Sequence, residues 1–365
     1  MGGKGWSTRH GTCSFAPQMP EDKQYAVEFV TTSGGRPKLR EVAGVDLGAS
    51  ATKAVLVRKT KEGLEVTDAR ILPPLKPGDG PGKKRLGMPS GWKCRYAALA
   101  VSPRRATIRY VTLHGRQDVH ARLETELQSH LSIEEDIRVA YRVVPHHRRE
   151  SETNVLIAGL PEAYAQAVLS LVSAGIPAAA SLEISGVVSV GAFMDWGPLG
   201  TEEGAVGFLE CGASSTVLAL FNRRNLCLMR KLPLGGDVLV ESIVARMQID
   251  RDTAEKMLQD GSFDISPLVG AMMTDFLQQL KISCEFVERR EETRVGRFFL
   301  SGGLVLAPYL RGHLESELRR KVVLWNPFQG LGTGGGDWQE GIAGQEPRFS
   351  AALGAAVGTL RGEGE

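Results

Sequence analysis

The chain has 365 residues, of which 42% are hydrophobic and 24% charged, and its formal net charge is +2. This length suggests about two or three folding units, and the composition excludes a disordered or collagen-like chain. The nearly balanced charge argues against a nucleic-acid partner, and the sequence has no run of about 18 apolar residues that would predict a membrane-spanning helix.

The first part of the chain is predicted to contain a tail, a hairpin and a loop. Residues 1–40 lack hydrophobic periodicity, and we expect a flexible tail there. From Glu41 onward, two apolar segments, VAGVDLG and TKAVLV, flank a short turn and predict a β-hairpin. Residues 72–92 are rich in proline and glycine, which indicates a loop.

A compact β-α-β-β-α module is predicted over residues 110–180. It follows a strand pair, YAALAVS and ATIRYVTL, with Pro103 between the two segments. Leucines recur every four residues within 118–131 and predict a helix with one apolar stripe. Two strand-like segments, VAYRVV and NVLIAGL, precede a second helix from Pro161 to Ala174.

The second half of the chain begins with the same succession of strand, turn and strand. The segments AVGFLE and TVLALF flank the turn CGASS, and a third strand, LCLMRKLPL, follows. Helices are predicted over 237–247, from an N-cap at Asp252, and over 267–289, where the amphipathic pattern is long. A buried strand, RFFLSGG, precedes a helix that ends near Arg320, and SAALGAAVGTL predicts a C-terminal helix.

The first hairpin turn has the sequence DLGASATK and is suited to binding phosphate. Its glycine, Gly48, lets backbone N–H groups approach an anion closely. Ser50, Thr52 and Lys53 can donate hydrogen bonds to phosphate oxygens, and Asp46 can hold a magnesium ion directly or through water. An ordinary hairpin turn with a solvated lysine is the alternative interpretation.

The second hairpin turn, ECGASST, repeats this order of acidic residue, glycine and hydroxyl groups. It comprises Glu210, Gly212, Ala213, Ser214, Ser215 and Thr216. Two such hairpins suggest two related lobes that clamp phosphates between paired turns. Two coincident glycine turns remain the alternative.

Two pairs of glycines follow strands in the second half and extend this pattern. Gly235 and Gly236 precede a helix N-terminus, which can face phosphate or ribose. Gly302 and Gly303 follow a buried strand and can let a flat base lie against the backbone. A tight turn and simple core packing are the alternatives for these motifs and for the small residues of the C-terminal helix.

The five cysteines are odd in number, widely spaced and without a CxxC pair, and the histidines lack metal-ligand spacing. We therefore expect reduced thiols, with neither a disulfide framework nor a zinc site.

Taken in order, these motifs resemble the phosphate-1, connect-1, phosphate-2, adenosine and connect-2 elements of the actin-like ATPase superfamily. The longer segments GVDLGASATKAVLV, LETELQSHL and RKLPLGGDVLVESIVARMQIDRDTAEKML resemble the PilM family of type IV pilus assembly proteins, which is related to the division protein FtsA. The resemblance extends from about Val42 to Gly358. It implies an α/β, actin-like (duplicated ribonuclease-H-like) two-lobed fold with an FtsA/PilM-type 1C subdomain inserted in the first lobe.

The resemblance also implies a division of the chain. The tail would cover 1–40, the first lobe (1A) 41–109 completed by 181–204 and 346–360, the 1C subdomain 110–180, and the second lobe (2A/2B) 205–345.

The resemblance further implies that ATP and Mg²⁺ occupy the cleft between the lobes. Asp46 and Glu210 would hold Mg²⁺ through water and are the candidate catalytic residues. The implied nucleotide-binding residues are Gly48, Ser50, Thr52, Lys53, Gly212, Ala213, Ser214, Ser215, Thr216, Gly235, Gly236, Glu255, Gly302 and Gly303.

Three positions depart from the family pattern. The second phosphate hairpin normally begins with Asp rather than Glu210, and the extra methylene would displace a metal-bound water. Leu258 replaces the lysine of an AExxK motif, in which Glu255 is retained, and Ser132 replaces a frequent proline. These departures predict ATP binding with weak or absent hydrolysis.

The implied partner is the cytoplasmic tail of a PilN-like inner-membrane protein, held in a groove between 1A and 1C. The implied location is therefore cytoplasmic and peripheral to the inner membrane. A stretch without acidic residues, 80–117, predicts attraction to an anionic membrane surface or to an acidic partner, although a solvated loop is the alternative. The basic residues proposed for the membrane are Lys83, Lys84, Arg85, Arg95, Arg104 and Arg105.

Two other functions stay open at this point, as does self-association. One is an FtsA-like membrane-associated filament protein, although the chain ends in an acidic segment rather than an amphipathic helix. The other is a small-molecule kinase of the same superfamily, which would need a catalytic base for which the sequence offers no further carboxylate motif.

Overall fold

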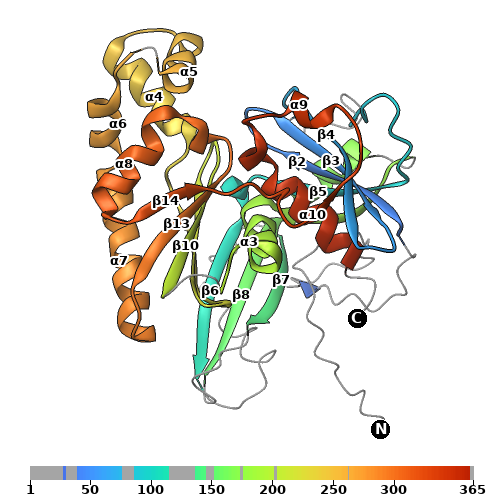
Figure 1. Ribbon diagram of the computed structural model, residues 1–365, viewed down its shortest axis with the longest axis horizontal. Coiled ribbons are helices and arrows are strands. Elements are labelled where there is room, and N and C mark those ends of the chain that lie inside the picture. Colours follow the sequence, from blue (N-terminus) through green and yellow to red (C-terminus); the bar gives the residue numbers. More distant parts are fainter. Residues whose placement is uncertain are drawn as a thin grey trace.

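The computed structural model contains three β-sheets and the helices that pack on them (Figure 1). It describes residues 28–29, 39–75, 86–114, 136–144, 152–172, 176–200, 204–261 and 263–361. In this part of the chain no helix is long and apolar enough to cross a bilayer. The described cysteines, Cys94, Cys211, Cys227 and Cys284, are buried, and no disulfide joins any of them.

A six-stranded sheet in the order β15-β4-β3-β2-β5-β9 forms the core of the first lobe. Its strands are β2 (Glu41–Leu47), β3 (Thr52–Lys59), β4 (Leu64–Leu72), β5 (Tyr96–Val101), β9 (Ala178–Ile184) and β15 (Gly332–Thr333). The predicted β2–β3 hairpin is confirmed, with Asp46 opposite Lys53 in the antiparallel register. Sequence analysis missed β4, which pairs with β3 and in which Val66 and Ala69 are the buried residues.

A five-stranded sheet in the order β12-β11-β10-β13-β14 forms the core of the second lobe. Its strands are β10 (Ala205–Cys211), β11 (Thr216–Asn222), β12 (Asn225–Leu232), β13 (Val295–Ser301) and β14 (Lys321–Leu324). Both sheets contain three antiparallel strands followed by two parallel ones, and β10 occupies the same place as β2. The two lobes are therefore related in topology, as the paired hairpins predicted.

Helices α7 and α8 lie along the outer side of the five-stranded sheet, and α4, α5 and α6 lie above it in the view of Figure 1. They are α4 (Gly236–Met247), α5 (Arg251–Asp260), α6 (Ser266–Met272), α7 (Thr274–Glu291) and α8 (Pro308–Leu318). The prediction of one continuous helix over 267–289 is wrong in one respect, because a turn at Met273 separates α6 from α7. The predicted N-cap is also wrong, because Asp250 and not Asp252 accepts the Thr253 N–H, at 2.8 Å.

A four-stranded sheet, ordered β1-β7-β8-β6, lies below and between the two lobes in Figure 1. It contains β1 (Glu28–Phe29), β6 (Thr107–His114), β7 (Ile137–Val144) and β8 (Glu152–Pro161), followed by α2 (Glu162–Leu169) and the 3₁₀ turn η2 (Ser170–Val172). The expected pairing of YAALAVS with ATIRYVTL is wrong. The first segment is β5 of the six-stranded sheet, the second is β6, and the 3₁₀ turn η1 (Pro103–Arg105) redirects the chain between them. The helix predicted over 118–131 lies outside the described residues, as do most of residues 1–40.

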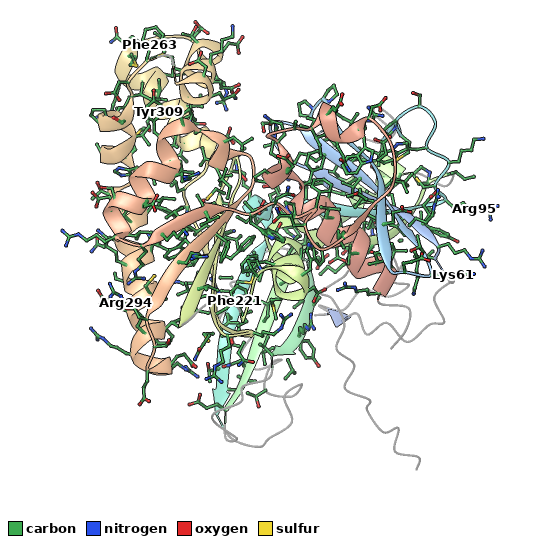
Figure 2. The ribbon with its side chains drawn as sticks, in the orientation of Figure 1. Lys61, Arg95, Phe221, Phe263, Arg294 and Tyr309 are labelled. Carbon is green, nitrogen blue, oxygen red and sulfur yellow. The ribbon has the colours of Figure 1, made fainter. Side chains whose placement is uncertain are left out.

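Two buried helices, α3 (Ser185–Trp196) and α10 (Ser350–Arg361), pack against each other between the lobes. Gly354 of α10 allows the close approach, because a Cβ there would lie 2.3 Å from the Val188 carbonyl oxygen. Phe193 of α3 stacks on Phe208 of the second sheet with ring centroids 4.6 Å apart. Phe221, labelled inside the molecule in Figure 2, belongs to the same aromatic cluster. The two helices thus connect the β2–β3 hairpin of the first lobe with the β10–β11 hairpin of the second.

Candidate nucleotide site

The first hairpin turn presents a buried ion pair. Asp46 Oδ2 lies 2.5 Å from Lys53 Nζ, and both residues are less than 10% exposed. A Cβ on Gly48 would come within 2.5 Å of that ammonium group, so glycine is needed for Lys53 to reach across the turn. Ser50 is exposed, whereas the Thr52 hydroxyl is buried and accepts the Leu75 N–H at 3.1 Å. The turn therefore presents one ammonium group, that of Lys53, which is paired with Asp46, and one exposed hydroxyl group, that of Ser50.

The second hairpin turn places its three hydroxyl groups differently. Ser215 Oγ is buried and has no hydrogen-bond partner among the described residues. Ser214 Oγ lies 2.7 Å from Ser102 Oγ, at the end of β5 in the other lobe. Thr216 donates to the Leu234 carbonyl oxygen at 2.8 Å, so it shapes the turn. The available donor at this turn is therefore Ser215, and Ser214 already bridges the two lobes.

Glu210 faces the first hairpin from the end of β10. Burial raises the pKa of Glu210 to about 7, and the hydrogen bond donated by Ser350 opposes that rise. The Asp46 carboxylate raises this pKa further, and the Lys53 charge lowers it, so the acidic residues of the two hairpins are within electrostatic reach of each other. A carboxyl group with this pKa is only partly ionised at neutral pH.

Serine hydroxyl groups on α3 and α10 link the two carboxylates. Ser185 donates to Asp46 Oδ1 at 2.7 Å, and Ser350 donates to Glu210 Oε2 at 2.9 Å. Between them, Ser189 Oγ lies 2.8 Å from the Ser185 carbonyl oxygen and 3.1 Å from Ser350 Oγ. Sequence analysis missed these serines. Polar residues inside the otherwise apolar segments that form α3 and α10 were the signal that could have found them.

Gly235 and Gly236, at the N-terminus of α4, allow this helix to pack closely on the second hairpin turn. A Cβ on Gly235 would lie 2.4–2.6 Å from backbone atoms of residues 213–215. The Gly236 and Asp237 N–H groups donate to the carbonyl oxygens of Gly212 and Ala213, at 3.1 and 2.7 Å. The first two N–H groups of α4 therefore donate hydrogen bonds to this turn and stabilise it.

Glu255 is connected to the same helix start through an arginine. Arg251 donates to Glu255 at 2.8 Å and to Asp237 at 2.7 Å. Glu255 is thus tied indirectly to the second hairpin, on the exposed surface of α5.

The two glycines after β13 close the other side of the site. Gly302 has a φ of +93°, and a Cβ there would lie 2.3 Å from the Cys211 carbonyl oxygen, so only glycine fits. Its N–H donates to the Pro347 carbonyl oxygen at 2.8 Å. A Cβ on the adjacent Gly303 would lie 3.8 Å from Arg348 Nε, a residue that sequence analysis did not single out.

The donor set at the site fits a hydrated magnesium ion. Within the described ranges, no group of three or more His, Cys, Asp or Glu residues could hold a metal by itself. Asp46 and Glu210 supply two carboxylates, which matches the way Mg²⁺ keeps several waters and binds one or two carboxylates together with phosphate oxygens.

The basic residues proposed for a membrane contact do not form one patch among the residues that the structure describes. Arg95 precedes the six-residue strand β5 and lies at the outer edge of the first lobe (Figure 2), whereas Arg104 and Arg105 follow that strand, about 20 Å away. Arg105 lies over the Tyr164 ring at 5.0 Å. Lys83, Lys84 and Arg85 lie outside the described residues.

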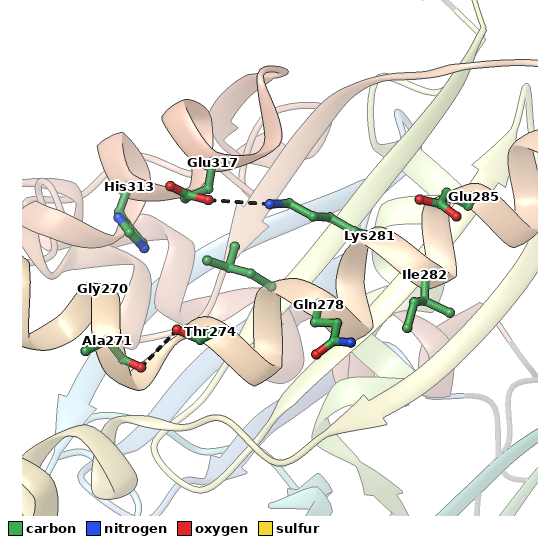
Figure 3. A pocket seen from close by; sticks show the side chains of 10 residues that line it. Gly270, Ala271, Thr274, Gln278, Lys281, Ile282, Glu285, His313 and Glu317 are labelled. Atoms are coloured by element: carbon green, nitrogen blue, oxygen red, sulfur yellow. Dashed lines mark hydrogen bonds and ion pairs between the residues drawn. The ribbon is translucent and has the colours of Figure 1, made fainter.

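A separate open groove lies on the outer surface, between α7 and α8 (Figure 3). Its volume is about 730 Å³, and its wall includes His313 and an ion pair in which Lys281 Nζ lies 3.4 Å from Glu317. None of the residues implied to bind nucleotide lines it.

Comparisons with known proteins agree with this architecture. The family model of "Type IV pilus assembly protein PilM" matches residues 84–360. A solved PilM–PilN type IV pilus biogenesis complex matches with a TM-score of 0.72 and 19% identity, covering 90% of this chain and 100% of that chain.

Two further structures are less similar. The ethanolamine utilization protein EutJ from Carboxydothermus hydrogenoformans has a TM-score of 0.45 and 13% identity, covering 89% of this chain and 91% of its own. An archaeal actin homologue in complex with ADP has a TM-score of 0.41 and 12% identity, and the match covers 88% of this chain and 99% of that chain. No curated protein matches the chain. Because the family model spans most of the sequence, the chain belongs to the PilM family of type IV pilus assembly proteins, with the actin-like α/β fold that its motifs predicted.

Proposed function

We propose that this protein is a cytoplasmic, nucleotide-dependent scaffold in the inner-membrane platform of a type IV pilus or a related secretion machine. ATP with Mg²⁺ would bind between the lobes, and the protein would be peripheral to the membrane. The observation that carries the proposal is the convergence of the two phosphate hairpins, which brings Lys53, Asp46 and Glu210 to one site.

Each of these groups has a defined task in the proposal. Lys53 would pair with phosphate oxygens, and the two carboxylates would orient the waters around Mg²⁺. The magnesium ion supplies charge neutralisation for the phosphates when bound. Glu210 retains a proton in part of the molecules near neutral pH, so it is a weaker acceptor for such waters than an ionised aspartate. Weak or absent ATPase activity is therefore part of the proposal.

The proposed partner is the cytoplasmic tail of a PilN-like membrane protein. Family membership and the likeness to a PilM–PilN complex support this choice. We place the tail in a groove between the six-stranded sheet, the 1A part of the first lobe, and the four-stranded sheet, the core of 1C. A synthetic tail peptide should bind with a measurable anisotropy change, and a scrambled peptide should not.

Thermal unfolding with Mg·ATP, with Mg·ADP and without nucleotide tests the cleft. A ligand at 100 times its Kd adds about 2.7 kcal/mol of stability, a shift of a few degrees. Lys53→Ala should abolish the shift. Arg58→Ala is the matched control, because Arg58 lies on the same strand in an ion pair that is half exposed, 2.8 Å from Glu41.

The nucleotide-induced shift is the quantity to compare, because Lys53→Ala also leaves Asp46 unpaired and lowers the baseline Tm. No shift in the wild type at millimolar nucleotide would refute the nucleotide site. Sedimentation with and without nucleotide separates the scaffold from a filament, since a filament would pellet.

A further inference from the structure

A short strap just before α10 is hydrogen-bonded to the end of β13, beside the candidate nucleotide site. It contains Gln345 and the 3₁₀ turn η4 (Glu346–Phe349). The Pro347 carbonyl oxygen accepts hydrogen bonds from Gly302 N–H and Ser301 Oγ, each at 2.8 Å. Phe349 is fully buried, and its ring centroid lies 5.5 Å from that of Phe328. Arg348, between these two anchors, therefore has a fixed backbone at the site.

The Arg348 guanidinium has a donor that the protein does not use. Nη1 donates to Gln345 Oε1 at 2.9 Å, but Nε is buried and has no hydrogen-bond partner among the described residues. Leaving a buried donor of a charged group unpaired is costly, so such a group is expected to meet an acceptor in some state of the protein.

The acceptor does not come from the nearby carboxylates. Arg348 forms no ion pair within the part of the chain that the structure describes. Asp46 is within electrostatic reach of Arg348, but its oxygens contact Lys53 and Ser185 rather than the guanidinium. The side chain lies beside Gly303, since a Cβ on that glycine would be 3.8 Å from Arg348 Nε. The unpaired donor is thus next to the Gly302–Gly303 motif and within electrostatic reach of the first hairpin.

We propose that Arg348 is a further nucleotide ligand, which contacts a phosphate group from the side of Gly302 and Gly303. This inference rests on the proposed nucleotide site. A guanidinium presents planar, forked N–H donors that match phosphate oxygens in pairs, which an ammonium does not. Because Ser350 lies two residues further along the chain and holds Glu210, phosphate capture by Arg348 also fixes the start of α10.

Isothermal titration of Mg·ATP, Mg·ADP and adenosine tests this assignment. Arg348→Ala should weaken binding of ATP and ADP by roughly 10- to 100-fold and change adenosine binding by less than about two-fold. Arg348→Lys should recover only part of the loss. Arg361→Ala is the control, since Arg361 ends α10 and pairs with Asp195 at 2.7 Å, away from the cleft.

Each outcome decides between the alternatives. Unchanged ATP affinity in Arg348→Ala overturns the inference while the nucleotide site stands. Equal losses for ATP and adenosine also overturn it, since they assign Arg348 to the base or to structure. If the alanine variant does not fold, Arg348→Gln, which keeps the stem and a donor, gives the same comparison. Absence of binding by the wild type would refute the proposed function itself, and the inference with it.

Discussion

Glu210 provides a quantitative test of the electrostatics of the cleft. Glu210→Gln keeps the size of the side chain and an acceptor for Ser350, but it removes the titrating proton. The pKa of Glu210 in the folded protein is raised to about 7, from 4.5 for an unperturbed glutamate, mainly by burial. A raised pKa means that the folded state binds this proton more tightly than the unfolded state.

The sign of the effect follows from that difference. The contribution of the protonated carboxyl to wild-type stability is present in full below pH 4.5 and is lost as the pH rises through about 7. A pKa change of this size corresponds to at most about 3 kcal/mol. With an unfolding entropy of about 2.1 cal/mol/K per residue, the change in Tm is roughly 4 °C for a chain of this length.

The assay is thermal unfolding of the wild type and Glu210→Gln between pH 4.5 and 8, without magnesium or nucleotide. The Tm of the variant relative to the wild type should rise through this window and level off above about pH 8. Glu317→Gln, at an exposed ion pair on α8, should leave the difference flat. A pH-independent difference between the wild type and Glu210→Gln would refute the reasoning, because it would mean that Glu210 titrates normally in the folded protein.

Three further predictions concern stability, each measured by urea unfolding. Gly354→Ala should destabilise the protein by about 1–3 kcal/mol, because the new methyl group would clash with the Val188 carbonyl oxygen. The control is Gly312→Ala in α8, which has open space around it and should stabilise the protein by about 0.5–1 kcal/mol. Equal effects of the two substitutions would contradict the packing of α3 on α10. Phe193→Ala should cost about 3–5 kcal/mol, because the ring is fully buried in the aromatic cluster, and a loss below 1 kcal/mol would argue against that cluster. Asp250→Ala should cost about 0.5–2 kcal/mol through loss of the α5 cap, while Asp252→Ala should cost less, and the reverse order would restore Asp252 as the cap.

The sequence was most informative where local pattern and tertiary structure agree. Both hairpins were predicted because β-branched strands flank glycine turns, and their strands remain paired in the fold. The pattern could not locate β4, whose buried apolar residues do not alternate with polar ones, or the four-residue strand β14, which owes its place to pairing with β13. It also joined α6 to α7, because the apolar stripe continues through the turn at Met273.

The candidate site was only partly predictable for a related reason. Asp46, Lys53 and Glu210 lie in motifs that are local in sequence. Ser185, Ser350 and Arg348 reach the site only because α3, α10 and the strap converge there, and no local pattern encodes that convergence. Thr216 is the opposite case: the motif predicted it as a nucleotide-binding residue, but in the fold its hydroxyl group donates to the Leu234 carbonyl oxygen.

The four-stranded sheet is connected to both lobes by different means. The chain joins it to the first lobe through η1, and side chains join it to the second. Tyr110 donates to the Leu226 carbonyl oxygen, and Lys231 donates to that of Ala106, each at 2.6 Å. Arg290 lies 2.5 Å from Glu152.

The four-stranded sheet therefore connects the first lobe with the second. Moving the second lobe away from this sheet would break those three contacts, in addition to the packing of α3 against the second lobe. Under the proposed function, a partner bound to this sheet would therefore contact the same region that joins the two lobes beside the candidate nucleotide site.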